Sequence, residues 1–200
     1  MGNLVKLNEN INTKYWESYA SVSDDGKTLY FTSNRPGGYG ELDIYKSVLG
    51  KDGQWGLAMN LGPAINTKYN DDAPVITSNG QLLYFSSLGH GTTGGYDIFF
   101  SEKDNMGIWK KPVNIGYPIN TTDDNLYFYP FSNGNFGLFA AVDEKGFGRF
   151  DIMQVEVFSA KHPKFYNVLA EFVASKDLVL PKKLTVRIVD KKQQQRGSKN

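Results

Sequence analysis

The sequence predicts an all-β fold made of tandem copies of one unit. The first observation is a repeat, in which the pentapeptide Ile-Asn-Thr-Lys-Tyr occupies residues 11–15 and again 65–69, and Ile-Asn-Thr-Thr-Asp occupies 119–123. The second is composition, because 14% of the residues are aromatic and 21 are glycine, as in folds rich in strands and turns. The third is the Asp-Gly pair at 25–26 and the Asn-Gly pair at 79–80, which are typical of tight hairpin turns.

The repeat keeps a constant period without insertion or deletion. The positions of Asn12, Asn66 and Asn120 increase by 54 at each step. The same period links other groups of residues, namely Gly40, Gly94 and Gly148, and the Asp-Ile pairs that begin at Asp43, Asp97 and Asp151. A fixed register over three copies predicts three units of the same structure.

Each unit is expected to hold four short strands. In the first copy we place them at residues 19–23, 27–33, 42–48 and 55–61. Turns at 24–26 and 50–53 and a Gly-rich loop at 34–41 connect them. In the second copy the second strand is apolar at consecutive positions, from Leu82 to Phe85, as expected for a strand covered on both faces. A four-stranded antiparallel unit of this kind, repeated in tandem, is a β-propeller blade, although the period exceeds the usual length of about 40–50 residues per blade.

The propeller repeats are predicted to span residues 4–160, with copies at approximately 4–56, 57–110 and 111–157. Closed propellers have about four to eight blades, so three blades predict part of a larger propeller. The period then ends, because position 174, where a fourth Asn would fall, is alanine. Residues 161–190, with strands expected at 165–173 and 184–189, are predicted to begin a β-sandwich-like domain or to supply closing strands. The polar tail at 191–200 is expected to be disordered.

The Ile-Asn-Thr segments are expected to be crossovers from the fourth strand of one unit to the first strand of the next. We predict that Ile anchors the crossover between blades, and that Asn and Thr bond to their own nearby backbone in a turn. Strands in an up-and-down meander alternate in direction, so these segments and the loops between second and third strands lie on one face. We call it the crossover face.

The crossover face is the expected site of partner binding, because binding residues concentrate on loops held by a rigid scaffold. Aromatic residues and Arg are the types enriched in interface anchors. The candidate residues are Tyr15, Trp16, Glu17, Arg35, Tyr39, Tyr69, Asp71, Asp72, His90, Tyr96, Phe147 and Arg149. For Tyr39 and Phe147 an alternative is that they wedge between blades, because each precedes a glycine that lets the backbone pack closely.

The sequence offers no clear catalytic constellation. His90 and His162 do not share a repeat position, so a His-based metal site or a Ser-His-Asp triad has little support. The paired carboxylates at 24–25, 71–72 and 123–124 are interpreted as turn caps. A calcium site at 71–72 or 123–124 is the alternative, although no Asp-x-Asp-x-Asp-Gly loop is present. We expect no enzyme activity, no cofactor and no metal.

The aspartates that recur at the start of the third strand, Asp43, Asp97 and Asp151, are interpreted as structural. A catalytic residue is rarely needed three times on one scaffold, whereas a carboxylate that bonds a neighbouring loop is needed in every copy.

Charge and hydropathy limit the partners. The chain has 22 basic and 21 acidic residues, and a net charge of +1 does not favour nucleic acid or an anionic membrane. There is no cysteine, so disulfides and thiolate metal sites are excluded. No apolar run is long enough to span a membrane. The first residues do not resemble a signal peptide, so we expect either a cytosolic chain or one whose leader has been removed.

Several motifs resemble a known family. Residues 23–35 (Ser-Asp-Asp-Gly-Lys-Thr-Leu-Tyr-Phe-Thr-Ser-Asn-Arg) and 40–45 (Gly-Glu-Leu-Asp-Ile-Tyr) resemble the WD-like repeat of TolB-type propellers. Residues 60–62 (Asn-Leu-Gly), 86–90 (Ser-Ser-Leu-Gly-His) and 94–98 (Gly-Gly-Tyr-Asp-Ile) are similar to the propeller of OmpA-family envelope proteins.

In that family a carboxypeptidase-regulatory-like β-sandwich and a peptidoglycan-binding domain follow the propeller, and members serve in type 9 secretion and gliding. The resemblance covers roughly residues 4–157. It implies a periplasmic or outer-membrane-associated protein with secretion or gliding components as partners. This chain lacks the peptidoglycan-binding domain, so peptidoglycan binding is transferred to no residue.

Three functions remain open. The first is a non-catalytic scaffold that binds protein partners, which predicts an apolar patch bordered by Arg on the crossover face. The second is a glycan- or peptidoglycan-associated module, which predicts that at least two of Tyr15, Trp16, Tyr69 and Tyr96 are exposed and coplanar. The third is a fragment of a propeller hydrolase or lyase, which predicts a His or carboxylate pocket in the central channel. Open blade edges also predict self-association, unless further blades complete the ring.

Overall fold

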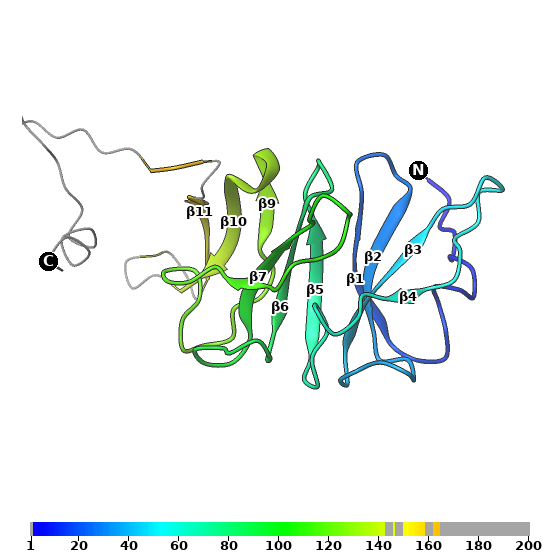
Figure 1. The fold of residues 1–200 in the computed structure, drawn as a ribbon, viewed down its shortest axis with the longest axis horizontal. Coiled ribbons are helices and arrows are strands. Elements are labelled where there is room, and N and C mark those ends of the chain that lie inside the picture. The colour runs from blue at the N-terminus through cyan, green and yellow to red at the C-terminus, as the bar shows by residue number, and fades with distance from the viewer. Residues whose placement is uncertain (1, 143–145, 147–149, 159–161, 165–200) are drawn as a thin grey trace, which may run out of the picture. The chain divides into compact units, whose positions relative to one another are not determined.

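The computed structural model describes residues 2–142, 146, 150–158 and 162–164. In this part of the chain three antiparallel sheets follow one another in sequence order (Figure 1). The first blade contains β1 (Glu17–Val22), β2 (Thr28–Ser33), β3 (Asp43–Val48) and β4 (Met59–Asn60). The second contains β5 (Asp71–Ile76), β6 (Leu82–Ser87), β7 (Asp97–Glu102) and β8 (Val113–Asn114). The all-β fold and the meander order of each blade are confirmed.

The third blade differs from the first two. Its described strands are β9 (Tyr129–Phe131), β10 (Phe136–Ala141) and β11 (Asp151–Glu156), and a short 3-10 turn, Ser132–Gly134, lies between the first two. The sheet order is β11-β10-β9, so β11 forms one edge of the described sheet. The prediction of four strands per copy is therefore met in two copies, and three strands are described in the third.

The fourth strand was predicted too long. We predicted a strand over residues 55–61, but β4 contains only two residues. A single bridge between Leu49 and Trp55 adds to its pairing with β3. The segment between them includes Gly56, whose N–H still donates to Val48 O. The predicted strands at 165–173 and 184–189, the sandwich-like segment and the polar tail lie outside the described residues.

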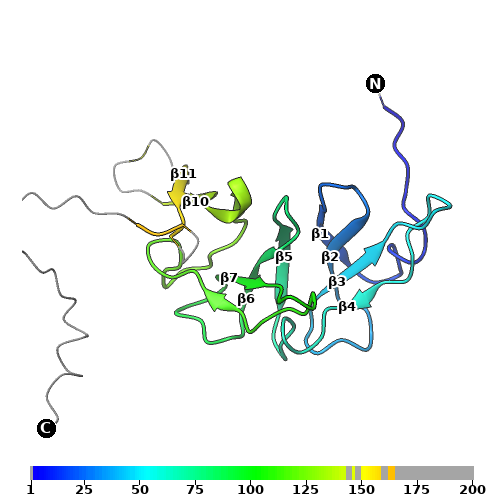
Figure 2. The same ribbon diagram turned by 45° about the horizontal axis from the view of Figure 1, so that its top comes forward.

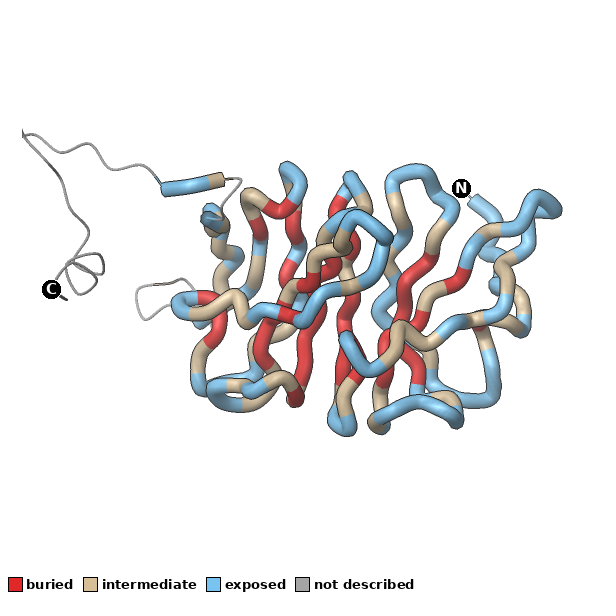
Figure 3. The backbone as a smooth tube through the Cα atoms, in the orientation of Figure 1, coloured by how far each residue is buried: buried red, intermediate tan, exposed pale blue. Residues whose placement is uncertain are grey.

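The core lies between blades, and the second strand of each four-stranded blade is buried on both faces (Figure 3). One cluster joins the first two blades and contains Tyr30, Ile44, Ile65, Ile76, Leu83, Phe85 and Phe99. Another joins the second and third blades and contains Tyr84, Ile98, Ile119 and Phe128. A third covers the outer face of the first blade and contains Ile11, Leu29, Phe31 and Tyr45. Each cluster holds one crossover isoleucine, and the predicted anchoring between blades is confirmed for Ile65 and Ile119, whereas Ile11 packs on the first blade.

Three equivalent positions of the repeat share a backbone irregularity. Tyr19, Ala73 and Tyr127, which are separated by one period each, have φ angles of 46°, 49° and 63°. The pairing registers of β1 with β2 and of β5 with β6 shift at this position. Such bulges re-aim side chains and are common next to binding sites. Strands β1 and β5 lie side by side in both ribbon views (Figure 2).

No helix among the described residues is long and apolar enough to cross a membrane.

Candidate functional site

The crossover asparagine is a clamp on the preceding blade rather than a local turn. Asn66 Oδ1 accepts from Ile44 N at 2.8 Å, and Asn66 Nδ2 donates to Ile44 O at 2.9 Å and to Asn60 Oδ1 at 2.8 Å. Asn120 makes the same three bonds, with Ile98 and Asn114 as its partners. The prediction that Asn bonds its own nearby backbone is wrong for Asn66 and Asn120, because each buried amide satisfies a strand 22 residues away, and it holds for Asn12, whose Nδ2 donates to Leu7 O.

A second repeated contact fixes the threonine of each crossover. Thr13 N donates to Glu17 Oε2, Thr67 N to Asp71 Oδ2, and Thr121 N to Asn125 Oδ1. These acceptors occupy one repeat position, which opens the first strand of each blade or precedes it. The threonine hydroxyl accepts the N–H two positions later, as predicted for a Thr turn, with Tyr15, Tyr69 and Asp123 as donors.

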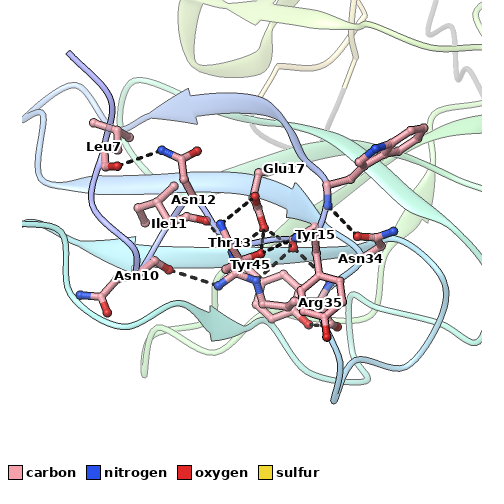
Figure 4. A network of polar contacts seen from close by, with 12 residues as sticks. Leu7, Asn10, Ile11, Asn12, Thr13, Tyr15, Glu17, Asn34, Arg35 and Tyr45 are labelled. Atoms are coloured by element: carbon pink, nitrogen blue, oxygen red, sulfur yellow. Dashed lines mark hydrogen bonds and ion pairs between the residues drawn. The ribbon is translucent and has the colours of Figure 1, made fainter.

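Arg35 locks the crossover that precedes the first blade (Figure 4). Its guanidinium donates to Ile11 O at 2.7 Å and to Asn10 O at 3.2 Å, and it contacts Glu17 Oε1 at 3.2 Å. It also lies 5.1 and 5.0 Å from the ring centroids of Phe31 and Tyr45. The side chains of Arg35 and Glu17 are only 14% and 10% exposed, so these two candidate residues satisfy each other inside the protein. Although burial raises the pKa of Glu17, hydrogen bonds from Thr13 and Ser33 and the Arg35 charge lower it overall.

His90 performs the corresponding task in the second blade. Its Nε2 lies 2.8 Å from Ile65 O and 4.0 Å from Asp71 Oδ1, and its ring packs against Phe85 and Phe99. These four partners are the equivalents, one period later, of the residues that surround Arg35, namely Ile11, Glu17, Phe31 and Tyr45. His90 was expected as a surface candidate, but its side chain is 11% exposed and it is held by the blade junction.

Asp71 and Asp72, also expected on the surface, are buried. Asp71 accepts from Ser87 Oγ and Thr67 N, and Asp72 accepts from Ala73 N. Burial raises the pKa of both carboxyls, even though these hydrogen bonds act in the opposite direction. The polarity of these two residues predicted exposure to solvent, but the fold supplies hydrogen-bond donors for them inside the protein. Neither carboxylate is available to a partner at the surface.

We expect Asp71→Asn to increase stability at neutral pH. The folded-state pKa of Asp71 lies above its unfolded value, so its stabilising contribution is complete below about pH 4 and is lost as pH rises through the folded-state pKa. Asparagine does not titrate, and Asn125 already makes the same bond to Thr121 N. Urea denaturation from pH 4 upward should show an advantage for the variant that grows with pH.

The matched control is Asp25→Asn, because hydrogen bonds from Ser23 and Lys27 lower the pKa of the exposed Asp25. Its contribution is present above about pH 4 and is lost on acidification, so this variant should lose stability at neutral pH. Equal pH dependence of both variants would contradict the assignment.

Four of the candidate aromatic residues remain at the surface, namely Tyr15, Trp16, Tyr39 and Tyr69. Trp16 is the most exposed of them at 75%. Tyr39 is half exposed, so the alternative that it wedges between blades is wrong. Lys14 and Lys68 lie over the rings of Tyr15 and Tyr69 at 5.3 and 5.1 Å, in another repeated arrangement.

Tyr96 lies partly buried beside this face. Its N–H donates to Asp124 Oδ1 at 2.9 Å, and burial raises the pKa of its hydroxyl. Phe147 and Arg149 lie outside the described residues.

Tyr19 of β1 and Tyr127, which lies just before β9, form a tyrosine site that was not among the predicted residues. Tyr19 and Tyr127 share a hydrogen bond of 2.7 Å between their hydroxyls, and this bond together with burial raises the pKa of Tyr127 to about 12. They border a groove of about 180 Å³, whose other lining residues are Ala20, Ala73, Pro74, Val75, Phe128 and Tyr129. The sequence contained one indication of this pair, because the equivalent position of the three copies is occupied by Tyr19, Ala73 and Tyr127.

The repeated aspartates are structural, as predicted, in the first two blades. Asp43 accepts from Tyr39 N, Gly40 N and Asn60 Nδ2, and Asp97 accepts from Thr93 N and Asn114 Nδ2. Among the described residues no group of three His, Cys, Asp or Glu side chains is placed to hold a metal ion.

Comparison with known proteins shows the fold. No protein-family model matches the chain, and no curated protein matches it. A TolB candidate from Agrobacterium tumefaciens has a TM-score of 0.50 at 18% identity, covering 76% of this chain and 49% of that chain. TolB from Acinetobacter baumannii gives 0.46 at 17% identity (69% and 29% covered), and a puromycin hydrolase mutant complexed with PGG gives 0.41 at 9% (74% and 28%).

This chain spans about half or less of the length of those structures. The Agrobacterium match and the three sheets define a β-propeller region. The region is similar to the propeller of TolB.

Proposed function

We propose that this chain is a non-catalytic propeller module of the bacterial cell envelope that binds protein partners through its crossover face. The observation that carries the proposal is the exposure of Trp16, together with Tyr15, Tyr39 and Tyr69, on that face. Large aromatic side chains anchor protein interfaces because they bury much area at low entropic cost.

The backbone beneath Trp16 is fixed, which favours binding. Trp16 N donates to Asn34 Oδ1 at 2.8 Å, and Asn34 N donates back to Trp16 O at 3.2 Å. The neighbouring Tyr15 N donates to the hydroxyl of Thr13, which in turn donates to Glu17. A platform that is already ordered loses little conformational entropy on association. Arg35 does not border this patch as a free cation, because Glu17 and the crossover carbonyls hold it.

The envelope assignment rests on sequence resemblance. The WD-like repeats resemble those of OmpA-family proteins of type 9 secretion and gliding, in which a carboxypeptidase-regulatory-like domain follows the propeller. That resemblance supports a periplasmic or outer-membrane-associated location and secretion or gliding components as partners. The net charge of +1 supports a protein partner over nucleic acid.

A glycan-binding module is the second candidate, and the exposure of Tyr15, Trp16 and Tyr69 favours it. Sugars stack on exposed aromatic faces, as required for such a site. The ring contacts found among the described residues include none between these three side chains, so they do not form one stacked platform. The third candidate, a fragment of a propeller hydrolase or lyase, predicts a pocket of His or carboxylate side chains, and the groove beside Tyr19 and Tyr127 is lined by neither.

A photo-crosslinking amino acid at position 16 is expected to give a discrete protein adduct in the envelope fraction of a bacterium that expresses the chain. The control position is Met106, which is 83% exposed on the opposite face, in the turn between β7 and β8. For a partner recovered this way, Trp16→Ala should weaken binding about 30-fold or more, as for an interface anchor.

Equal adducts at positions 16 and 106 would contradict the proposal. A change in tryptophan fluorescence on adding soluble peptidoglycan fragments, lost in Trp16→Ala, would instead support the glycan module.

A further inference from the structure

The groove beside the tyrosine pair is separate from the partner surface proposed above. Its lining combines three tyrosines with apolar side chains such as Pro74 and Val75. Tyr19, Tyr127 and Tyr129 are between 44% and 62% exposed, so their rings border the groove without being covered by the protein. Exposed aromatic side chains around an apolar groove are typical of binding sites.

Two of these rings are already fixed against each other. The hydroxyls of Tyr19 and Tyr127 lie 2.7 Å apart, and their ring centroids lie 5.4 Å apart with the ring planes tilted by 48°. Because the two residues belong to the first and third copies of the repeat, this hydrogen bond holds the pair across the groove. A pair of rings that is held in advance loses little conformational entropy when a ligand binds, and aromatic faces attract cations.

A buried carboxylate lies beneath the wall of this groove. Asp72 is only 8% exposed, and its Oδ1 accepts a hydrogen bond of 2.7 Å from the N–H of Ala73, a residue of the wall. The Tyr19 hydrogen bond and burial are the main causes of the raised pKa of Tyr127, and the charge of Asp72 adds to them. None of the ion pairs among the described residues includes Asp72. Buried carboxylates are usually paired, so the groove has a negative charge that no cation balances there.

Elsewhere in the same molecule, two aromatic rings and a carboxylate hold a guanidinium. The ring centroids of Phe31 and Tyr45 lie 6.1 Å apart, and the Arg35 guanidinium lies 5.1 and 5.0 Å from them. The carboxylate of Glu17 lies 3.2 Å from this guanidinium (Figure 4). The groove has a ring pair of similar spacing and a carboxylate nearby, but none of its lining residues is Lys or Arg.

We infer that the groove binds an arginine side chain of a partner protein. The guanidinium lies over the rings of Tyr19 and Tyr127, and its methylene stem packs on Pro74. Asp72 attracts the cation through the groove wall, where the low dielectric constant strengthens the attraction.

The size of the groove and the chemistry of the rings select this ligand. The volume of about 180 Å³ lies below the about 300–1,000 Å³ of most small-molecule sites and suits one side chain. Arginine is favoured over lysine because its planar, weakly hydrated guanidinium stacks on aromatic faces. The site does not involve Trp16 or the other aromatic residues of the crossover face.

The test is an NMR titration of the full chain with an acetylated and amidated glycine-arginine-glycine peptide. The reference is the same peptide with citrulline, the neutral isostere of arginine. The arginine peptide should bind about tenfold more tightly or better, because only its side chain is a cation. The backbone amide signals of Ala20 and Ala73, which line the groove, should shift.

Asp72→Asn should weaken binding of the arginine peptide about tenfold and leave the citrulline peptide unchanged, because it removes the charge and keeps the shape. Asp71→Asn is the matched control, since it removes the neighbouring buried charge, which lies beside His90, and should change the affinity less than about twofold. Ala20→Leu should abolish binding of both peptides by filling the groove, whereas Ser18→Leu, at another exposed position of β1, should not.

Equal affinity for the arginine and citrulline peptides would overturn the inference, and so would a lysine peptide that binds as tightly as arginine. Shifts confined to the Trp16 indole would overturn the groove as the site and leave the crossover-face proposal standing. Circular dichroism of each variant distinguishes loss of binding from loss of fold. If Asp72→Asn does not fold, Ala20→Leu against Ser18→Leu still decides whether the groove is the site.

Discussion

Asn66→Ala is expected to cost about 2–4 kcal/mol of unfolding free energy, because it leaves the buried N–H of Ile44 without a partner and removes one of the two donors to Ile44 O, which keeps Leu61 N. Each buried polar group without a hydrogen bond costs about 1–3 kcal/mol, and Asn60 Oδ1 also loses a donor. Urea denaturation followed by tryptophan fluorescence suits the measurement, since Trp109 packs against the cluster that joins the first two blades.

Asn12→Ala is the matched control, at the same repeat position. Its only side-chain bond among the described residues is the exposed one to Leu7 O, so its loss should cost less than about 0.5 kcal/mol. A similar cost for both variants would show that the asparagine acts through the crossover turn, as the sequence alone suggested, and not as a clamp on the preceding strand.

The repeat made the fold predictable. A constant period places apolar side chains of every copy in the same environment, so the consecutive apolar run of β6 and the crossover isoleucines were interpreted correctly. The fourth strand was overestimated because its composition resembles a strand, while pairing with β3 ends after two residues. Local propensity does not show how long a neighbouring strand offers partners.

The candidate site was only partly predictable. Trp16 and Tyr69 are exposed as expected, but Asp71, Asp72, Glu17 and Arg35 find their partners inside the protein. Polar residues near loops are usually exposed to solvent. Whether hydrogen-bond partners await them inside the protein depends on tertiary contacts, which the sequence does not show. A signal was present, since Glu17, Asp71 and Asn125 share one repeat position and all three are acceptors. A surface anchor has no reason to recur in every blade, whereas a structural acceptor does.

The groove tyrosines were missed for a geometric reason. A strand alternates its side chains between two faces, so one extra residue reverses the assignment of every following position. The register shifts between Ser18 and Ser21, with Tyr19 in the left-handed region. Strict alternation along β1 therefore misplaces Tyr19, and its partner Tyr127 lies 108 residues away.

Gly94→Ala is expected to cost about 3 kcal/mol, at the upper end of the usual range for overpacked sites. A Cβ atom at Gly94 would lie 2.2 Å from Thr122 O and 2.5 Å from Thr122 C, in the crossover that follows the second blade. These are backbone atoms, which cannot rotate away as a side chain can. The loop between β6 and β7 must then move off the crossover, which weakens the packing around Ile119.

Gly40 stands in the same relation to the crossover between the first and second blades. A Cβ atom at Gly40 would lie 2.0 Å from Tyr69 O, so Gly40→Ala should cost a similar amount. Gly56→Ala is the control, because its added Cβ would meet only Val48 O at 3.2 Å. Its cost should stay below about 1 kcal/mol, because the lower entropy of the unfolded chain offsets part of this single mild contact. Urea denaturation of the three variants measures these values. Equal costs for all three variants would contradict this explanation, because they would show that close packing of loop on crossover is not what makes Gly40 and Gly94 necessary.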